Sequence, residues 1–145
     1  MSMIEKIQNQ KKLYALIVRS KYRKKKGINF FTDKNATQQF GYMNHKKDHI
    51  ILPHRHNKRQ SKILLTTEVI IILKGILRVD FYSDKEKYLF SKKLYSNDII
   101  MLSSGGHGFK VLKDAQMIEV KQGPYSLSMD KVKFENVNEN KIKIR

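Results

Sequence analysis

Residues 64–82 read Leu-Leu-Thr-Thr-Glu-Val-Ile-Ile-Ile-Leu-Lys-Gly-Ile-Leu-Arg-Val-Asp-Phe-Tyr, and this stretch decides the fold class. Over residues 76–82, apolar side chains alternate with polar ones, which is typical of a strand that buries one face and turns the other to water. Leu77, Val79 and Phe81 are the residues expected to face the core. A strand of this kind belongs to an antiparallel sheet.

The residues from Val69 to Leu73 are all apolar, so this part of the stretch has two faces to bury. The outer face then needs cover from another sheet or from another subunit. The dipeptide Lys74-Gly75 predicts a turn between the two runs. We therefore expect two strands here, and a homodimer.

Short apolar or alternating runs recur along the chain, whereas apolar residues at helical spacing are rare. Turn-forming residues separate the runs, among them Ser83-Asp84, Ser96-Asn97-Asp98 and Lys113-Asp114. Regular short strands with such breaks indicate a mainly β protein, either a sandwich or a closed barrel. The predicted strands are 13–19, 28–32, 39–44, 49–56, 64–73, 76–82, 87–94, 98–102, 107–112 and 116–121.

The length of 145 residues fits a single domain, because two separate cores would each be marginal in size. The chain has no cysteine, which leaves imidazole and carboxylate groups as the available metal ligands. Its longest apolar run falls far short of the roughly 20 residues that a spanning helix needs. We expect a soluble, cytoplasmic protein with no membrane span.

The net charge of +17 would suit nucleic acid, an acidic membrane surface or a phosphorylated small molecule as partner. A second explanation is compositional, since AT-rich coding also gives many Lys, Ile and Asn residues without any binding role. Nucleic acid is the weakest of these hypotheses. Its bases would stack on aromatic residues near the basic run 21–26, namely Tyr14, Tyr22, Phe30 and Phe31.

Four residues form a candidate metal site. His54 and His56 are two positions apart in a strand-like segment, so both imidazoles project from the same face. Glu68 opens an apolar strand, where an unpaired charge is costly and a bound cation would offset that cost. His107 follows the Gly-rich turn 103–106 and is the fourth candidate ligand. Three nitrogens and one oxygen suit a single Zn, Fe, Mn, Ni or Co ion.

These residues resemble the two signatures of the cupins. The first signature has His-x-His, then Glu, six residues and Gly, and is similar to His54-Arg55-His56 with Glu68 and Gly75. The second is a Gly-rich turn followed by His, and it looks like Ser103-Ser104-Gly105-Gly106-His107. The resemblance implies one jelly-roll-like cupin β-barrel over residues 1–145. Its core would span about 38–121, with basic N-terminal strands over 1–37 and a C-terminal extension over 126–145.

Three segments resemble, more specifically, the small single-domain cupins found among polysaccharide and nucleotide-sugar biosynthesis proteins. They are Gln-Phe-Gly-Tyr-Met-Asn-His at 39–45, Gly-Gly-His-Gly-Phe at 105–109 and Glu-Val-Lys-Gln-Gly-Pro-Tyr at 119–125. Relatives in that group include sugar ketoisomerases and epimerases, some of which use His and Tyr as acid and base without any metal. The resemblance implies a phosphorylated or nucleotide-linked sugar as ligand. Isomerase- or epimerase-like catalysis and non-catalytic, regulatory binding both stay open.

Catalysis of that kind needs a second group that moves a proton. The candidates are Tyr125, Glu119 and Lys121, which lie at or just after the predicted strand 116–121. The direction of two of these side chains is open: an apolar interior would turn Glu119 and Lys121 outward, whereas a polar pocket would turn them inward.

Two further residues are candidate substrate contacts. Arg59 lies in the extended loop 57–66, which we expect to project over the barrel mouth, and Gln122 lies in the segment that resembles the sugar-acting cupins. His45 and His49 lie in a polar stretch and are expected on the surface.

Overall fold

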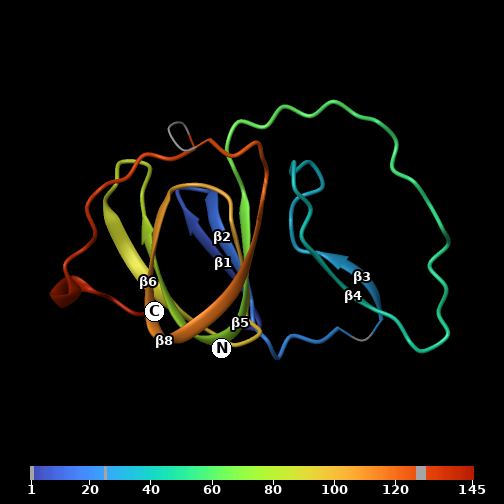
Figure 1. Ribbon diagram of the computed structural model, residues 1–145, viewed down its shortest axis with the longest axis horizontal. Coiled ribbons are helices and arrows are strands. Elements are labelled where there is room, and N and C mark those ends of the chain that lie inside the picture. The colour runs from blue at the N-terminus through green and yellow to red at the C-terminus, as the bar shows by residue number, and fades with distance from the viewer. Residues whose placement is uncertain (1, 25, 127–129) are drawn as a thin grey trace.

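The computed structural model describes residues 2–24, 26–126 and 130–145, and it is mainly β, as the sequence predicts (Figure 1). Among the described residues no helix is long and apolar enough to cross a membrane. The elements are β1 (Ile4–Asn9), β2 (Lys12–Val18), β3 (Gly27–Phe30), β4 (Gly41–Asn44), β5 (Glu68–Tyr82), β6 (Tyr88–Tyr95), β7 (Ile99–Leu102), β8 (Gly106–Lys121) and the 3-10 turn η1 (Glu139–Lys141).

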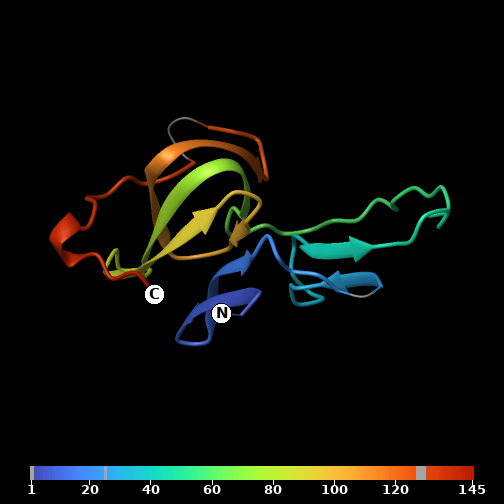
Figure 2. The ribbon, with the colours of Figure 1, turned by 90° about the horizontal axis from the view of Figure 1, so that it is seen from below.

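Six strands form one antiparallel sheet in the order β1-β2-β7-β5-β6, with β8 on the other edge of β5. The start of β5 pairs with β7 and its second half pairs with β6, while β8 follows β5 along its whole length. The sheet curls into a half-barrel, and the hairpin of β3 and β4 forms a separate small sheet beside it (Figures 1 and 2).

The ribbon of β5 and β8 is bent so strongly that its two ends meet. Leu102 pairs with Glu68 at the start of β5, and Gly106 pairs with Tyr82 at its end. The three residues 103–105 that link these positions reach at most about 14 Å. A straight strand from Glu68 to Tyr82 would span roughly 45 Å. The short link and the pairing register therefore require the ribbon to curl.

The bend occurs at irregular pairing around Gly75. The register between β5 and β8 shifts three times between Ile72 and Leu77, as it does at β-bulges. Gly75 has φ +93°, and a Cβ there would overlap the carbonyl oxygen of Asp114 and lie 2.7 Å from the Cα of Ala115. The predicted turn at Lys74-Gly75 is therefore wrong, because the strand continues through the glycine as a bulge.

Several other predicted boundaries also differ. The turn expected at Lys113-Asp114 lies inside β8, and β1 was not predicted. Residues 49–56 are not a strand: the segment 45–67 is a long connection that runs out past the small sheet and back to β5 (Figure 1). Pro53 lacks a backbone donor, and no strand of residues 2–24, 26–126 and 130–145 pairs with this segment.

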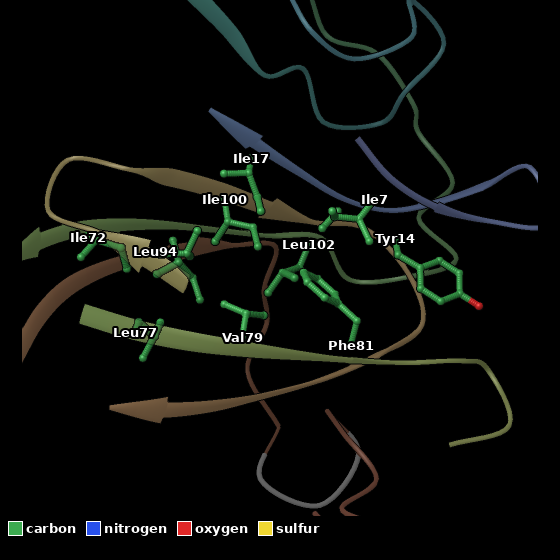
Figure 3. Close-up of a cluster of buried hydrophobic side chains, with 12 residues drawn as sticks. Ile7, Tyr14, Ile17, Ile72, Leu77, Val79, Phe81, Leu94, Ile100 and Leu102 are labelled. Carbon is green, nitrogen blue, oxygen red and sulfur yellow. The ribbon is translucent and has the colours of Figure 1, made fainter. Parts of the chain in front are cut away.

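The core lies inside the curl (Figure 3). Leu77, Val79 and Phe81 are at most 1% exposed, which confirms the predicted inward face. They pack with residues from β1, β2, β5, β6 and β7, namely Ile7, Tyr14, Ala15, Ile17, Ile70, Ile72, Leu94, Ile100 and Leu102.

The opposite face of β5 was expected to meet water, and it is instead covered by the C-terminal segment. Arg78 is 5% exposed and Asp80 4% exposed. Arg78 donates to Asp80 at 2.8 Å and to the carboxylate of Glu139 at 2.8 Å, and the Ser91 hydroxyl donates to Asp80. The backbone of Ser91 also bonds Lys143 and Arg145. Each buried charge is thus paired, as burial requires.

We predict that Gly75→Ala destabilises the fold far more than Gly27→Ala does. Both glycines have positive φ, so both variants incur about 1–2 kcal/mol of backbone strain. A Cβ at Gly27 meets nothing within 4 Å, whereas a Cβ at Gly75 overlaps the backbone of β8. Urea unfolding should show a loss of about 3 kcal/mol or more for Gly75→Ala. Equal losses for the two variants would contradict the bulge.

We also predict that Glu139 contributes acid-sensitive stability. Its hydrogen bonds from Arg78 and Lys110 lower the pKa of Glu139 from 4.5 to about 2. A lowered pKa means that this stability is fully present above pH 4.5 and is lost as the pH falls toward 2. Glu139→Gln should therefore lower the urea midpoint at pH 7. Below pH 4.5 the midpoint of this variant should decrease less with falling pH than that of the wild type.

The matched control is Glu135→Gln, since Glu135 is exposed and has no ion pair or side-chain hydrogen bond in the described part of the chain. The same pH dependence in both variants would show that the contact of Glu139 with the barrel does not form.

Candidate functional site

The bend of the ribbon brings two of the predicted metal ligands together. Nε2 of His107 lies 3.2 Å from Oε2 of Glu68. The Glu68 side chain is 14% exposed and the His107 side chain 28% exposed, so the pair is partly screened from water and still accessible. Glu68 begins β5 and His107 is the second residue of β8, so this contact joins opposite ends of the ribbon.

The turn before His107 is fixed to the barrel. The hydroxyls of Ser103 and Ser104 both donate to the carbonyl oxygen of Leu13, at 2.8 and 2.6 Å. Gly105 has φ +70°, and a Cβ there would lie 2.7 Å from the ring of Tyr14. The Gly-rich turn is therefore required by close packing, and it aims the imidazole of His107 toward Glu68.

The surroundings keep Glu68 ionised at neutral pH. The hydrogen bond from His107 lowers the pKa of Glu68, and the charges of Lys121 and Lys131 lower it further, whereas burial raises it. The net pKa lies below the ordinary value of 4.5. Nε2 of His107 donates to this carboxylate, and Nδ1 has no hydrogen-bond partner among the described residues. That nitrogen is free for a ligand.

A cavity of about 590 Å³ opens beside the pair. This volume is in the range of ordinary small-molecule sites. The lining is mixed, with cations, carboxylates and apolar side chains from five parts of the chain. It is made by Lys12, residues 64–66 with Glu68, residues 83, 84 and 86, residues 102–107, and residues 130–132 with Phe134.

Lys121 contacts two residues of this cavity, and Tyr125 contacts Lys121. Lys121 pairs with Glu68 in the register of β5 and β8 and binds Asp130 at 2.5 Å. Asp130 raises the pKa of the Lys121 amine. The ammonium also lies 5.0 Å from the ring centre of Tyr125, whose side chain is largely exposed.

Register determines which way the other candidates face. Glu119 is the partner of Ile70, which is buried in the core, so Glu119 and Lys121 project from the same face as Glu68.

Gln122, the second predicted substrate contact, instead bonds the residue before β5. Its amide oxygen accepts from the Thr67 backbone at 2.7 Å, and its amide nitrogen donates to the Thr67 hydroxyl at 2.6 Å.

The other two predicted ligands are not in this cluster. His54 and His56 are exposed in the connection 45–67, where their rings contact each other edge-on at 5.4 Å. Across the described residues, no three His, Asp or Glu side chains converge into a group that fits a metal ion. In this arrangement Glu68 and His107 alone would supply two ligands, which is fewer than a structural or catalytic site uses.

The predicted substrate contact Arg59 and the other two histidines, His45 and His49, also lie along that connection. Arg59 is exposed in its middle, and His45 stacks on His49 with ring centres 4.1 Å apart. Sequence reasoning missed most of the charged residues that line the cavity, namely Lys12, Asp84, Glu86, Asp130 and Lys131; the last two come from the segment read as an extension. Only their charges mark them in the sequence.

No protein-family model, curated protein or solved structure matches the chain.

We predict that His107→Phe raises the pKa of Glu68. The substitution keeps an apolar ring over the carboxylate but removes the hydrogen bond that lowers the pKa most, so burial then dominates. In the wild type the pKa of Glu68 is lower in the folded than in the unfolded state. The pair therefore stabilises the protein above pH 4.5, and this stabilisation is lost as the pH falls below that value. Carbon-detected NMR of the Glu68 carboxyl measures the shift directly.

Lys131→Ala is the matched control, because Lys131 makes the last and smallest of the contributions that lower the pKa of Glu68. A larger rise in Lys131→Ala than in His107→Phe would contradict the pairing of Glu68 with His107.

Proposed function

We propose that this chain is a small cupin-like barrel that binds a nucleotide-linked sugar and catalyses proton transfer on it, as an isomerase or epimerase does. The observation that carries the proposal is the Glu68–His107 pair at 3.2 Å beside a cavity large enough for a sugar. The motif resemblance at residues 105–109 and 119–125 supports the same class of ligand. The proposal needs only groups that this chain holds near one another.

The pair has the chemistry of a general acid and base. The ionised carboxylate of Glu68 accepts a hydrogen bond from Nε2–H of His107, which leaves Nδ1 as the basic nitrogen. Nδ1 would take a proton from the carbon next to a sugar carbonyl and return it to the same or the neighbouring carbon. The carboxylate stabilises the imidazolium that forms between these steps.

Two further groups would complete the site. Tyr125 lies beside Lys121, and its phenol would donate a proton to the developing enolate oxygen. Lys131 lines the cavity and has no ion-pair partner in the described part of the chain, so its charge is available to a phosphate group. Both roles belong to this proposal.

A metal-dependent form is the second candidate. His54 and His56 lie on a connection without helix or strand whose last residues lead directly into Glu68. A rearrangement of that connection would bring the imidazoles of His54 and His56 beside the Glu68 carboxylate and the His107 imidazole. An ion held by these four side chains would polarise a sugar oxygen. Elemental analysis of the wild type, His54→Ala and His107→Ala tests this form. Stoichiometric metal lost in both variants supports it, and metal-free wild-type protein opposes it.

The decisive test is solvent exchange. The protein is incubated in D2O with a panel of 4-keto-6-deoxy nucleotide sugars, and deuterium at the carbons next to the carbonyl is followed by NMR. We expect exchange with at least one member of the panel, reduced by about 10²–10⁴ in His107→Ala, as for loss of a general base. Tyr125→Phe should retain the exchange of the first proton better than His107→Ala does.

Exchange with none of the sugars would overturn the catalytic proposal. If the same sugars raise the unfolding temperature without exchange, the chain is a binding protein of the same ligand class. Loss of that stabilisation in Lys131→Ala would then place the ligand in this cavity.

A further inference from the structure

The positive charge of this protein is concentrated in one part of the chain. Residues 21–66 hold twelve lysines and arginines against two aspartates, so 46 residues carry ten of the seventeen net charges. We call these residues the basic lobe; it comprises β3, β4 and the connections that flank them. Figures 1 and 2 show the lobe projecting to one side of the half-barrel. A purely compositional bias would have been shared by the whole chain.

The described charges of the lobe are not neutralised by ion pairs within the described part of the protein. Every ion pair among the described residues joins side chains of the barrel or of the C-terminal segment, and none includes a residue of the basic lobe. The potential of the lobe is therefore directed at solvent, where it attracts an anionic partner.

The same lobe exposes apolar side chains. On the hairpin, Ile28 pairs with Met43 and shares its face with Phe30, and these residues are 55%, 60% and 59% exposed. On the connection 45–67, further exposed apolar residues occur as two runs of three, Ile50, Ile51 and Leu52, then Ile63, Leu64 and Leu65, the last two of which also line the barrel cavity. Exposed apolar groups on this scale mark a surface that binds something.

Four aromatic residues of the lobe, Tyr22, Phe31, Phe40 and Tyr42, pack together inside it. Tyr22 contacts Phe31 and Tyr42 edge-on at 5.3 and 5.1 Å, and this cluster packs against Leu16 of β2. Tyr14 lies in the barrel core. Of the aromatic residues expected to stack on bases, only Phe30 is left exposed, so the lobe lacks a platform for single-stranded nucleic acid. A second copy of the lobe is disfavoured by its like charge.

We propose that the basic lobe binds the surface of a membrane that contains anionic lipid. Its lysines and arginines would lie among the headgroups, and its aliphatic residues, Ile50 to Leu52 foremost, would enter the boundary with the acyl chains. Anionic headgroups match the positive charge of the lobe, and the apolar layer beneath them matches its exposed apolar side chains. This inference is independent of the chemistry proposed for the barrel cavity.

The test is co-sedimentation with vesicles at pH 7.4, comparing pure phosphatidylcholine with a mixture containing 30% phosphatidylglycerol. We expect binding to the anionic vesicles only, weakening with added salt. Lys58→Gln with Arg59→Gln should weaken it about fivefold for each charge removed. Ile50→Ser, Ile51→Ser and Leu52→Ser together should weaken it on the order of tenfold or more.

Matched controls lie on the barrel. Lys87→Gln with Lys113→Gln removes two exposed charges, and Val111→Ser with Ile118→Ser removes two exposed apolar side chains of β8. Both should bind as the wild type does. Circular dichroism and urea unfolding confirm that each variant is folded.

Three results would overturn the proposal: equal binding to both kinds of vesicle, control variants that weaken binding as much as lobe variants do, or no vesicle binding by a protein that binds a 30-nucleotide oligothymidine. The last result would reassign the lobe to nucleic acid.

Discussion

The bend in the ribbon of β5 and β8 is the constraint on which the rest of the structure depends. The link 103–105 is too short to join Leu102 to Gly106 unless the far end of β5 returns to its beginning. That return encloses the core between the two halves of the sheet. It also brings Glu68 to His107, although these residues begin different strands and lie 39 positions apart. Gly75 permits the bend because no side chain fits there.

Sequence patterning predicts what the sheet buries and misses how the sheet closes. The alternation at Leu77, Val79 and Phe81 identifies the inner face, because period 2 follows directly from strand geometry. A glycine between two apolar runs is compatible with a turn or with a bulge, and only pairing with β8 decides for the bulge. Arg78 and Asp80 look solvent-exposed locally, since their partner Glu139 comes from a distant part of the chain. Contacts of that kind leave no local signal.

Of the predicted metal ligands, only those that lie in paired strands come together. Glu68 and His107 meet because regular pairing and a tightly packed turn position both of them. His54 and His56 have the spacing of a strand, but spacing alone does not supply a neighbouring strand to pair with. Lys121 and Glu119 lie on the same face of the sheet as Glu68 and Ile70, their partners in β5, which the sequence left open; Glu119 is nevertheless exposed. All the ion pairs of the described residues lie outside the basic lobe, whose described cations have none, so the two regions suit different partners.

The contact between the ends of the ribbon can be measured directly in solution. A carbon-edited NOESY spectrum would record cross-peaks between the imidazole protons of His107 and the γ-methylene protons of Glu68. The account predicts these cross-peaks together with those of the pairs Phe81–His107 and Glu68–Lys121. Register cross-peaks without any between Glu68 and His107 would show that the ribbon does not curl far enough to form the site, and would contradict the account.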